Sequence, residues 1–196
     1  VTLKERELNS IPMSKRAQII AVVNQNERNV FPFSCLETIL FGLHPHRLRF
    51  EPLSEEQMNR VEQTMELTET DTLASRSISE VSGGEYQRVI LARAIVQQPK
   101  VLLLDEAMSD FDVAAKIRIS KCLRRLAEVG MTILSVNHDL NLAYQFSDHI
   151  LAMHQGELTA FGTPNEVITA PFLRRVFGIE AEFFPGKGFL IRDEAQ

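Results

Sequence analysis

Short apolar runs that end in polar residues recur along the chain and indicate strands. The first, Ile19–Val23, is rich in β-branched residues and is followed by Asn24-Gln25-Asn26. Val101–Leu104 is apolar at every position, and Met131–Val136 is a further run that ends in polar residues. The all-apolar run at residues 101–104 is typical of a parallel strand that is covered on both faces. The pattern therefore predicts buried parallel strands at these three places.

Helix signals fill the intervals between the strands. Ser34 with Glu37, and Ser54 with Gln57, have the spacing of a capping box, so a helix is expected to begin after each serine. Gly42 is expected to end the first of these helices. The expected helices span about residues 35–41, 54–67, 84–98, 113–129 and 140–147, with two short helices within 164–178.

The order of these elements indicates the fold class. Strands and helices alternate from residue 99 onward, which predicts an α/β sheet with right-handed crossovers. Further strands are expected at His149–Met153 and Glu157–Phe161, and a hairpin is expected around Pro185-Gly186. The long helix over residues 113–129 is expected to place Ile117 and Leu123 on its apolar side.

Composition narrows the class of protein without indicating a function. Hydrophobic residues make up 44% of the 196 and charged residues 24%, close to the globular average, so a packed core is expected. The net charge of −5 and the lack of a long Lys/Arg tract argue against a nucleic-acid partner. Cys35 and Cys122 lack the spacing of a metal site, so both are expected to be buried or half-buried thiols. The sequence contains no run of 18 apolar residues, so no membrane span is predicted.

Two adjacent carboxylates, Asp105 and Glu106, follow the apolar run at residues 101–104. In an open α/β sheet, ligands bind beyond the carboxyl ends of the strands. One carboxylate can hold Mg²⁺, which prefers one or two carboxylates together with phosphate oxygens. The other can polarise a water molecule for attack on a phosphate. Taken alone, the pair is equally compatible with a solvated acidic turn.

Ser82-Gly83-Gly84-Glu85 stands at the start of an expected helix. Two glycines let a ligand approach the backbone closely, and the N–H groups and dipole of a helix start attract anions. An ordinary helix cap has the same residues, and a lone His138 or Gln25 is more often packed or at the surface than functional. The combination favours a single nucleotide site, because all of these residues stand at strand ends or at a helix start.

These residues together resemble the nucleotide-binding subunits of ABC transporters, and the resemblance covers essentially the whole chain. It implies a P-loop NTPase-like α/β fold with an inserted helical subdomain, and an ATP hydrolase that uses ATP and Mg²⁺. The matching stretches are Val23–Gln25 for the Q-loop, Val81–Glu85 for the signature motif, Val101–Glu106 for Walker B with its catalytic glutamate, Ser109–Asp112 for the D-loop and Val136–Asp139 for the H-loop.

The resemblance also implies a division of the chain. Residues 1–28 would be the remainder of the N-terminal ATPase core, 29–98 the helical subdomain, 99–162 the core with Walker B, D-loop and H-loop, and 163–196 C-terminal helices and a tail. No G-x-x-x-x-G-K-S/T phosphate loop (Walker A) occurs in the 196 residues, and Gly186-Lys187-Gly188 is no substitute. In the family this loop lies upstream of the Q-loop, so we expect an incomplete fold without the N-terminal strands and the phosphate loop.

The family's functional roles can be carried over residue by residue. Glu106 would be the general base, and His138 would contact the γ-phosphate. Asp105 and Gln25 would hold Mg²⁺, partly through water. Ser82, Gly83 and Gly84 would bind ATP that is held by a second copy of the subunit. The implied nucleotide contacts are Gln25, Ser82, Gly83, Gly84, Glu85, Asp105 and Asp112.

A weaker resemblance indicates a group of importers. The stretch from Glu37 to Phe50 and the tail Val176–Ile179 are similar to importer ATPases for iron-siderophores, haem and cobalamin. It implies a head-to-tail homodimer on the cytoplasmic face of the membrane, as a peripheral protein. Transmembrane permease subunits would dock on residues 30–50, and a substrate-binding protein would take part indirectly. A ferric siderophore is the first expectation for the cargo, with haem and cobalamin as alternatives and manganese or zinc still open.

Two other interpretations are compatible with parts of the sequence. One is a non-catalytic fragment or degenerate paralogue that acts as a binding or structural module, although retention of Glu106 and His138 argues against long degeneration. The other is a soluble ABC protein of DNA repair or translation, but the long coiled-coil insertions or paired ATPase domains of such proteins are not seen. The D-loop also departs from the usual Pro-Thr-Ser-x-Leu-Asp, since this chain has Ala107-Met108-Ser109-Asp110-Phe111-Asp112.

The isolated 196-residue chain is expected to bind ATP weakly and not to hydrolyse it. The physical reason is that a phosphate loop supplies most contacts to the β- and γ-phosphates. Titration calorimetry with MgATP measures this directly. A dissociation constant in the micromolar range would contradict the expectation.

Overall fold

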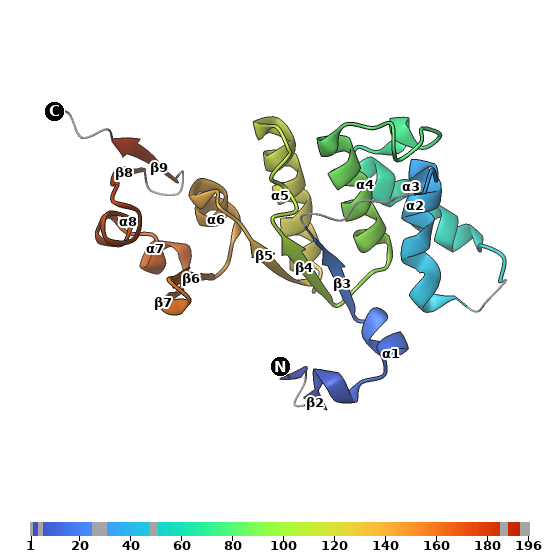
Figure 1. Ribbon diagram of the computed structural model, residues 1–196, viewed down its shortest axis with the longest axis horizontal. Helices are drawn as coiled ribbons and strands as arrows, with labels where there is room; N and C mark the ends of the chain where they lie inside the picture. The colour runs from blue at the N-terminus through green and yellow to red at the C-terminus, as the bar shows by residue number, and fades with distance from the viewer. Residues whose placement is uncertain (1, 4–5, 25–30, 48–50, 185–187, 193–196) are drawn as a thin grey trace. The chain divides into compact units, whose positions relative to one another are not determined.

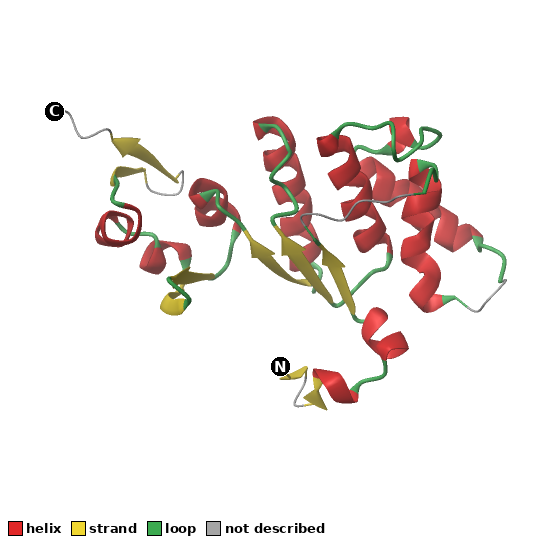
Figure 2. Ribbon diagram, viewed as in Figure 1, coloured by secondary structure: helices red, strands yellow, loops and turns green. Residues whose placement is uncertain are grey.

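The chain forms two compact units, and its computed structural model describes residues 2–3, 6–24, 31–47, 51–184 and 188–192. The first unit is Val1–Val136 and the second is Asn137–Gln196. Hydrophobic clusters of buried side chains lie within each unit. Figure 1 labels the elements, and Figure 2 distinguishes helices from strands. The expected division into four segments remains a prediction.

A three-stranded parallel sheet organises the first unit (Figure 1). Strands β3 (Ile20–Val23), β4 (Val101–Asp105) and β5 (Thr132–Val136) pair in that order, which confirms the three expected strands. Helix α4 (Gly83–Val96) precedes β4, and helix α5 (Val113–Glu128) connects β4 to β5. Both crossovers step across the sheet in the same direction, and right-handed crossovers of this kind place their helices on one face.

The described residues cover only one face of this sheet. On the opposite face, Val22, Leu134 and Val136 are 44%, 61% and 52% exposed. The prediction that β3 and β5 are buried strands is therefore wrong for this face in the described part of the chain, because α4 and α5 pack on the opposite face. The covered face is lined by Ala21, Val23, Leu102 and Leu104, none more than 5% exposed.

A second hydrophobic core joins α4 to the helices that precede it. Both expected capping boxes are confirmed, at Ser34 and at Ser54. The first α-helix ends at Leu40, close to the expected Phe41, but Gly42 does not stop the chain there, which continues as a 3-10 helix. Gly42 instead permits close packing, since a Cβ on it would overlap the carbonyl oxygen of Arg93 in α4. The helices of this region are α2 (Cys35–Leu40), η2 (Phe41–His46), α3 (Glu55–Leu67) and η3 (Asp71–Leu73).

Helix α5 buries a different stripe of side chains from the one expected. Ile119 and Leu123 are buried, but Ile117 is 38% exposed. Residues 117 and 119 differ by about 200° around a helix axis, so they cannot share one face. The chain enters the sheet through short elements, which are β1 (Thr2–Leu3), β2 (Arg6–Glu7), η1 (Leu8–Ser10) and α1 (Met13–Ala17).

The second unit packs two antiparallel hairpins with three helices around a small core. The core is built on Ile168, Phe172, Leu173 and Phe189. The strands expected on either side of Pro185-Gly186 are present, while that turn lies outside the described residues. The elements are α6 (Leu140–Phe146), β6 (Ile150–His154), β7 (Glu157–Gly162), α7 (Pro164–Val167), α8 (Ala170–Phe177), β8 (Glu180–Phe184) and β9 (Gly188–Arg192).

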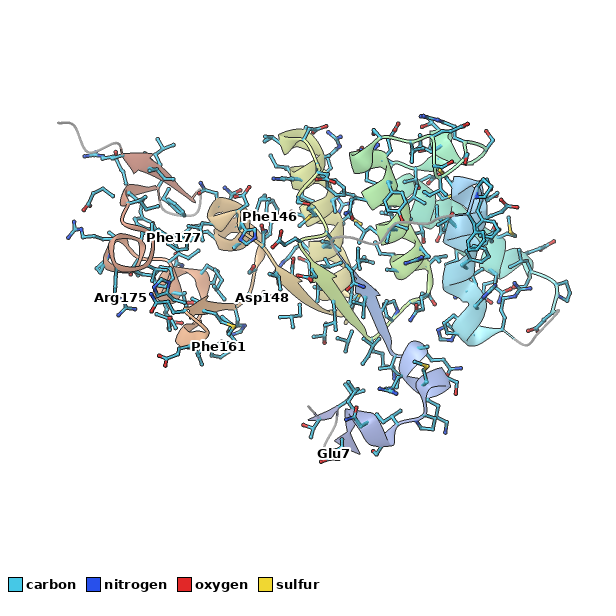
Figure 3. The ribbon with its side chains drawn as sticks, in the orientation of Figure 1. Glu7, Phe146, Asp148, Phe161, Arg175 and Phe177 are labelled. Carbon is cyan, nitrogen blue, oxygen red and sulfur yellow. The ribbon has the colours of Figure 1, made fainter. Side chains whose placement is uncertain are left out.

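One side of the β6–β7 hairpin is apolar and open. Leu151 pairs with Phe161, and Met153 pairs with Leu158 after a bulge. All four side chains are more than half exposed, and Phe161, labelled in Figure 3, is 67% exposed. The ring of His149 stacks on Phe161 with 5.8 Å between ring centroids. An open apolar surface of this kind is uncommon on a monomeric chain.

Both cysteines are buried free thiols, as expected. Burial raises the pKa of the Cys35 thiol and of the Cys122 thiol, because it disfavours the charged thiolate. In the part of the chain that the structure describes, no helix is both long enough and apolar enough to cross a membrane.

Two leucines in neighbouring strands of the sheet test its one-sided burial. Leu104→Ala removes a side chain that is 2% exposed and is expected to lower the free energy of unfolding by about 2–5 kcal/mol. Leu134→Ala, at a position 61% exposed, is expected to change it by less than about 1 kcal/mol. Urea unfolding of both variants measures the difference. Equal losses would show that the second face is covered in solution.

Candidate functional site

The start of helix α4 is organised by a reciprocal cap between Ser82 and Glu85. The Ser82 backbone N–H and hydroxyl both donate to one Glu85 carboxylate oxygen, each at 2.8 Å. The Glu85 backbone N–H donates in return to the Ser82 hydroxyl oxygen at 3.4 Å. Gly83 and Gly84 are the first two residues of the helix, positions whose N–H groups have no partner inside a helix. The cap therefore holds both glycines in place at an anion-attracting helix end.

Arginine 76 engages the other oxygen of the same carboxylate. Arg76 Nη1 lies 3.2 Å from Glu85 Oε1, and Arg76 Nη2 donates to the Glu80 carbonyl oxygen at 2.8 Å. The hydrogen bonds from the Ser82 backbone and hydroxyl, aided by the charges of Arg76 and Arg88, lower the pKa of Glu85. One Glu85 oxygen thus serves the cap and the other binds Arg76, and the expected contact of Glu85 with nucleotide stays a prediction.

The two acids expected beyond a strand end lie at the carboxyl end of β4. Asp105 is the last residue of the strand, is exposed, and pairs with Val136 of β5. Glu106 follows with its backbone N–H donating to the Val136 carbonyl oxygen at 3.2 Å. Its φ is 49°, a left-handed conformation that costs a non-glycine residue about 1–3 kcal/mol. Strain of this kind gathers at functional sites, and no pattern in the sequence indicated it.

The loop after Glu106 brings the strand end to the start of α4. Phe111 is 6% exposed and packs in the sheet core. It stands where the family's D-loop usually has leucine, so the apolar character of the position is kept. Asp112 caps α5, its carboxylate accepting from the Ala115 N–H at 2.7 Å. Directly before these anchors, the Asp110 carboxylate lies beside Gly83 and the Asp110 carbonyl beside Gly84. The structure thus gathers the glycine pair and the acid-bearing loop within one unit.

His138, the expected γ-phosphate contact, belongs to the second unit. It is exposed there and lines a cavity of about 300 Å³ together with Asn137. Asp139 caps α6, its carboxylate accepting from the Leu142 N–H at 3.1 Å. Gln25 lies outside the described residues. The roles of His138 and Gln25 therefore stay predictions.

Asp105 provides a suitable ligand for Mg²⁺. Within the described ranges, no three His, Cys, Asp or Glu side chains gather as a closed metal site. Magnesium does not need one, because it keeps several waters and binds through one or two carboxylates plus substrate phosphates. An exposed carboxylate at a strand end fits that donor set.

Comparison with known proteins connects the chain to one group of relatives. A family model described as "ABC transporter" matches residues 1–109. The hemin import ATP-binding protein HmuV of Rhodopseudomonas palustris (strain BisB5) is 35% identical over 188 residues, which cover 92% of this chain and 69% of the relative. HmuV of Escherichia coli O157:H7 is 36% identical over 185 residues, covering 91% and 70%. The petrobactin import ATP-binding protein FpuC of Bacillus anthracis is 31% identical over 187 residues, covering 95% and 69%.

Solved structures share the fold. An inward-facing putative metal-chelate type ABC transporter superposes with a TM-score of 0.75 at 23% identity, over 90% of this chain and 73% of the other. A bacterial ABC transporter cassette solved as a dimer gives a TM-score of 0.69 at 25% identity, over 81% of this chain and 70% of the other. The expected α/β ATPase fold is thereby confirmed.

The hydrogen bonds at the start of α4 predict an acidic titration for Glu85. Its carboxyl is expected to titrate below the ordinary 4.5, because Ser82 donates twice to the charged form. The cap therefore stabilises the fold above that value, and this contribution is lost as the pH falls through the lowered pKa. Carboxyl-carbon NMR measures the midpoint. Ser82→Ala should move it upward, and an unchanged midpoint would show that the hydroxyl bond is not formed.

Proposed function

Because this chain belongs to the ABC transporter family, we propose that it is the ATP-binding subunit of an importer for a metal chelate. Membership of the family confirms the expected ABC-type ATP hydrolase chemistry at the level of the family. The single observation that carries the proposal is the juxtaposition in the first unit. The glycine pair at the start of α4 lies against the loop that follows Asp105 and Glu106.

The glycine pair would contact a phosphate directly. Gly83 and Gly84 carry no Cβ, so a phosphate oxygen can reach their N–H groups at the positive end of a 14-residue helix. Ser82 orients this helix start by capping it. The ATP itself would be held by a phosphate loop that is not among these 196 residues, on a second copy of the subunit.

The acid pair would perform the chemistry on the other nucleotide of the dimer. Asp105 would hold Mg²⁺ through water, and that ion would neutralise charge on the phosphate oxygens. Glu106 would accept a proton from the attacking water, a role worth about 10²–10⁴-fold in rate. Its left-handed backbone is held by the Val136 carbonyl and by the Ser109 N–H, which donates to the Glu106 carbonyl at 3.1 Å. His138 would contact the γ-phosphate, and Gln25 the metal or the water.

The printed names of the relatives support the class of cargo and partner. Relatives are described as hemin import and petrobactin import proteins, which favours an iron chelate over free metal ions. We therefore propose hemin or a ferric siderophore as the cargo. The partners would be transmembrane permease subunits and a second copy of this chain, with the subunit bound peripherally at the cytoplasmic face of the membrane.

Substitution of the proposed base tests the catalytic role. In the assembled transporter, Glu106→Gln is expected to lower ATP turnover by about 10²–10⁴-fold while ATP binding is kept, because the amide cannot accept the proton. Phosphate release in proteoliposomes measures turnover, with Glu62→Gln on the exposed side of α3 as the control for a lost charge. Turnover within twofold of the native complex would show that Glu106 is not the general base.

Uptake measurements test the cargo separately. Cells that lack this subunit are expected to lose uptake of either iron-labelled hemin or a ferric siderophore, and to regain it with the native chain but not with Glu106→Gln. Uptake of labelled cobalamin and manganese serves as the comparison. Loss of one of these instead, with both iron chelates still taken up, would overturn the proposed cargo.

A further inference from the structure

Helix α3 ends in a Schellman turn that has a charged residue at the position where glycine is usual. The Glu69 backbone N–H donates to the Glu66 carbonyl oxygen at 3.2 Å, and the Thr70 N–H donates to the Met65 carbonyl oxygen at 2.9 Å. This pair of hydrogen bonds requires a left-handed residue at position 69, and the φ of Glu69 is 55°. Helix α5 has a glycine at the corresponding place, Gly130.

Buried neighbours hold the turn in this conformation. Thr68 and Thr70 are both 0% exposed. The Thr68 hydroxyl donates to the Thr64 carbonyl oxygen at 2.8 Å and lies 3.0 Å from the Thr70 hydroxyl. Glycine would satisfy this backbone without strain, so the turn itself gives no reason for a glutamate at position 69. Backbone strain at a residue that is not glycine is a reason to examine what its side chain does.

The side chain of Glu69 binds an arginine of α5, 49 residues further along the chain. Arg118 Nη2 donates to Glu69 Oε2 at 3.0 Å, and Arg118 Nε contacts Glu69 Oε1. Each carboxylate oxygen therefore meets its own nitrogen of the planar guanidinium group. A two-point contact of this kind fixes the direction of approach as well as the distance.

The ion pair joins the two hydrophobic cores of the first unit outside α4. Helix α3 contributes Met65 to the core that it shares with α2, and helix α5 contributes Ile119 to the sheet core. The Arg118 and Glu69 side chains are 50% and 41% exposed, and a pair this exposed contributes only modestly to stability. The pair can therefore open while both cores stay packed.

We propose that Glu69 and Arg118 form a latch, which holds the helical region of α2, α3 and η3 in a fixed direction against α5 and loosens that region when it opens. The left-handed backbone of Glu69 is maintained for this contact. Salt screens a half-exposed ion pair, so high ionic strength loosens the helical region without unfolding either core. The inference concerns the subunit itself and does not rest on the proposed nucleotide or cargo.

Amide hydrogen exchange of the 196-residue chain, followed by NMR at Leu73 and Ala74 of the turn after the latch, tests the inference. Glu69→Gln removes the charge and is expected to raise their exchange rates about two- to fivefold, the range that a half-exposed ion pair allows. Arg118→Gln should do the same, and the double variant should exceed neither single variant. High salt should bring the native chain toward the rates of Glu69→Gln.

A matched control is available within α5. Glu128→Gln breaks the Arg124–Glu128 ion pair, which joins residues of one helix, and changes the net charge equally. Its exchange rates at Leu73 and Ala74 should match those of the native chain. Urea unfolding of every variant verifies that the fold is kept.

Glu69→Asn separates the latch from the turn. Asparagine tolerates the left-handed conformation but is uncharged and one methylene shorter, so exchange should rise as it does in Glu69→Gln. Exchange at or below the native rate in Glu69→Asn would show that position 69 serves only the turn, and the inference would be overturned. The same conclusion would follow from native rates in Glu69→Gln, or from an equal rise in Glu128→Gln.

Discussion

Helix α4 packs between two hydrophobic cores and contributes buried apolar side chains to both. Ile90, Leu91 and Ile95 face the parallel sheet, while Val89 and Val96 face the helices that precede it. Neither core is complete without α4. The direction of this one helix, and with it the position of its first turn, is therefore determined by packing against both cores.

The candidate site depends on that packing more than on any polar interaction. The Ser82–Glu85 cap decides where α4 begins, but the two cores decide where that beginning lies. The loop after β4 is anchored in the same sheet core by Phe111. As a result, the glycine pair and the loop after β4 lie beside one another.

Features that depend on neighbouring residues could be predicted from the sequence. Features that depend on contacts between distant segments could not. The capping boxes at Ser34 and Ser54 were confirmed because each acts over three residues. The helical path was expected to stop at Gly42 but continues through it. This glycine instead allows close packing against the carbonyl oxygen of Arg93, which lies far along the chain. The expected burial of the strands holds for one face only in the described part of the chain. An apolar residue in the sequence does not indicate which face of the sheet a helix will cover. The left-handed backbone of Glu106 could not be predicted, because a glutamate does not by itself favour that conformation.

The sequence by itself determined the chemistry of this protein. It specified the order of glycines, acids and a histidine that marks the ABC family, the starts of the main helices, and the apolar runs that become strands. Only the tertiary structure decided that α4 and α5 share one face of the sheet and that Asp110 lies against Gly83 and Gly84. The physical reason is range: capping and strand patterning act over a few residues, whereas these contacts join segments brought together by burial of the two cores that enclose α4.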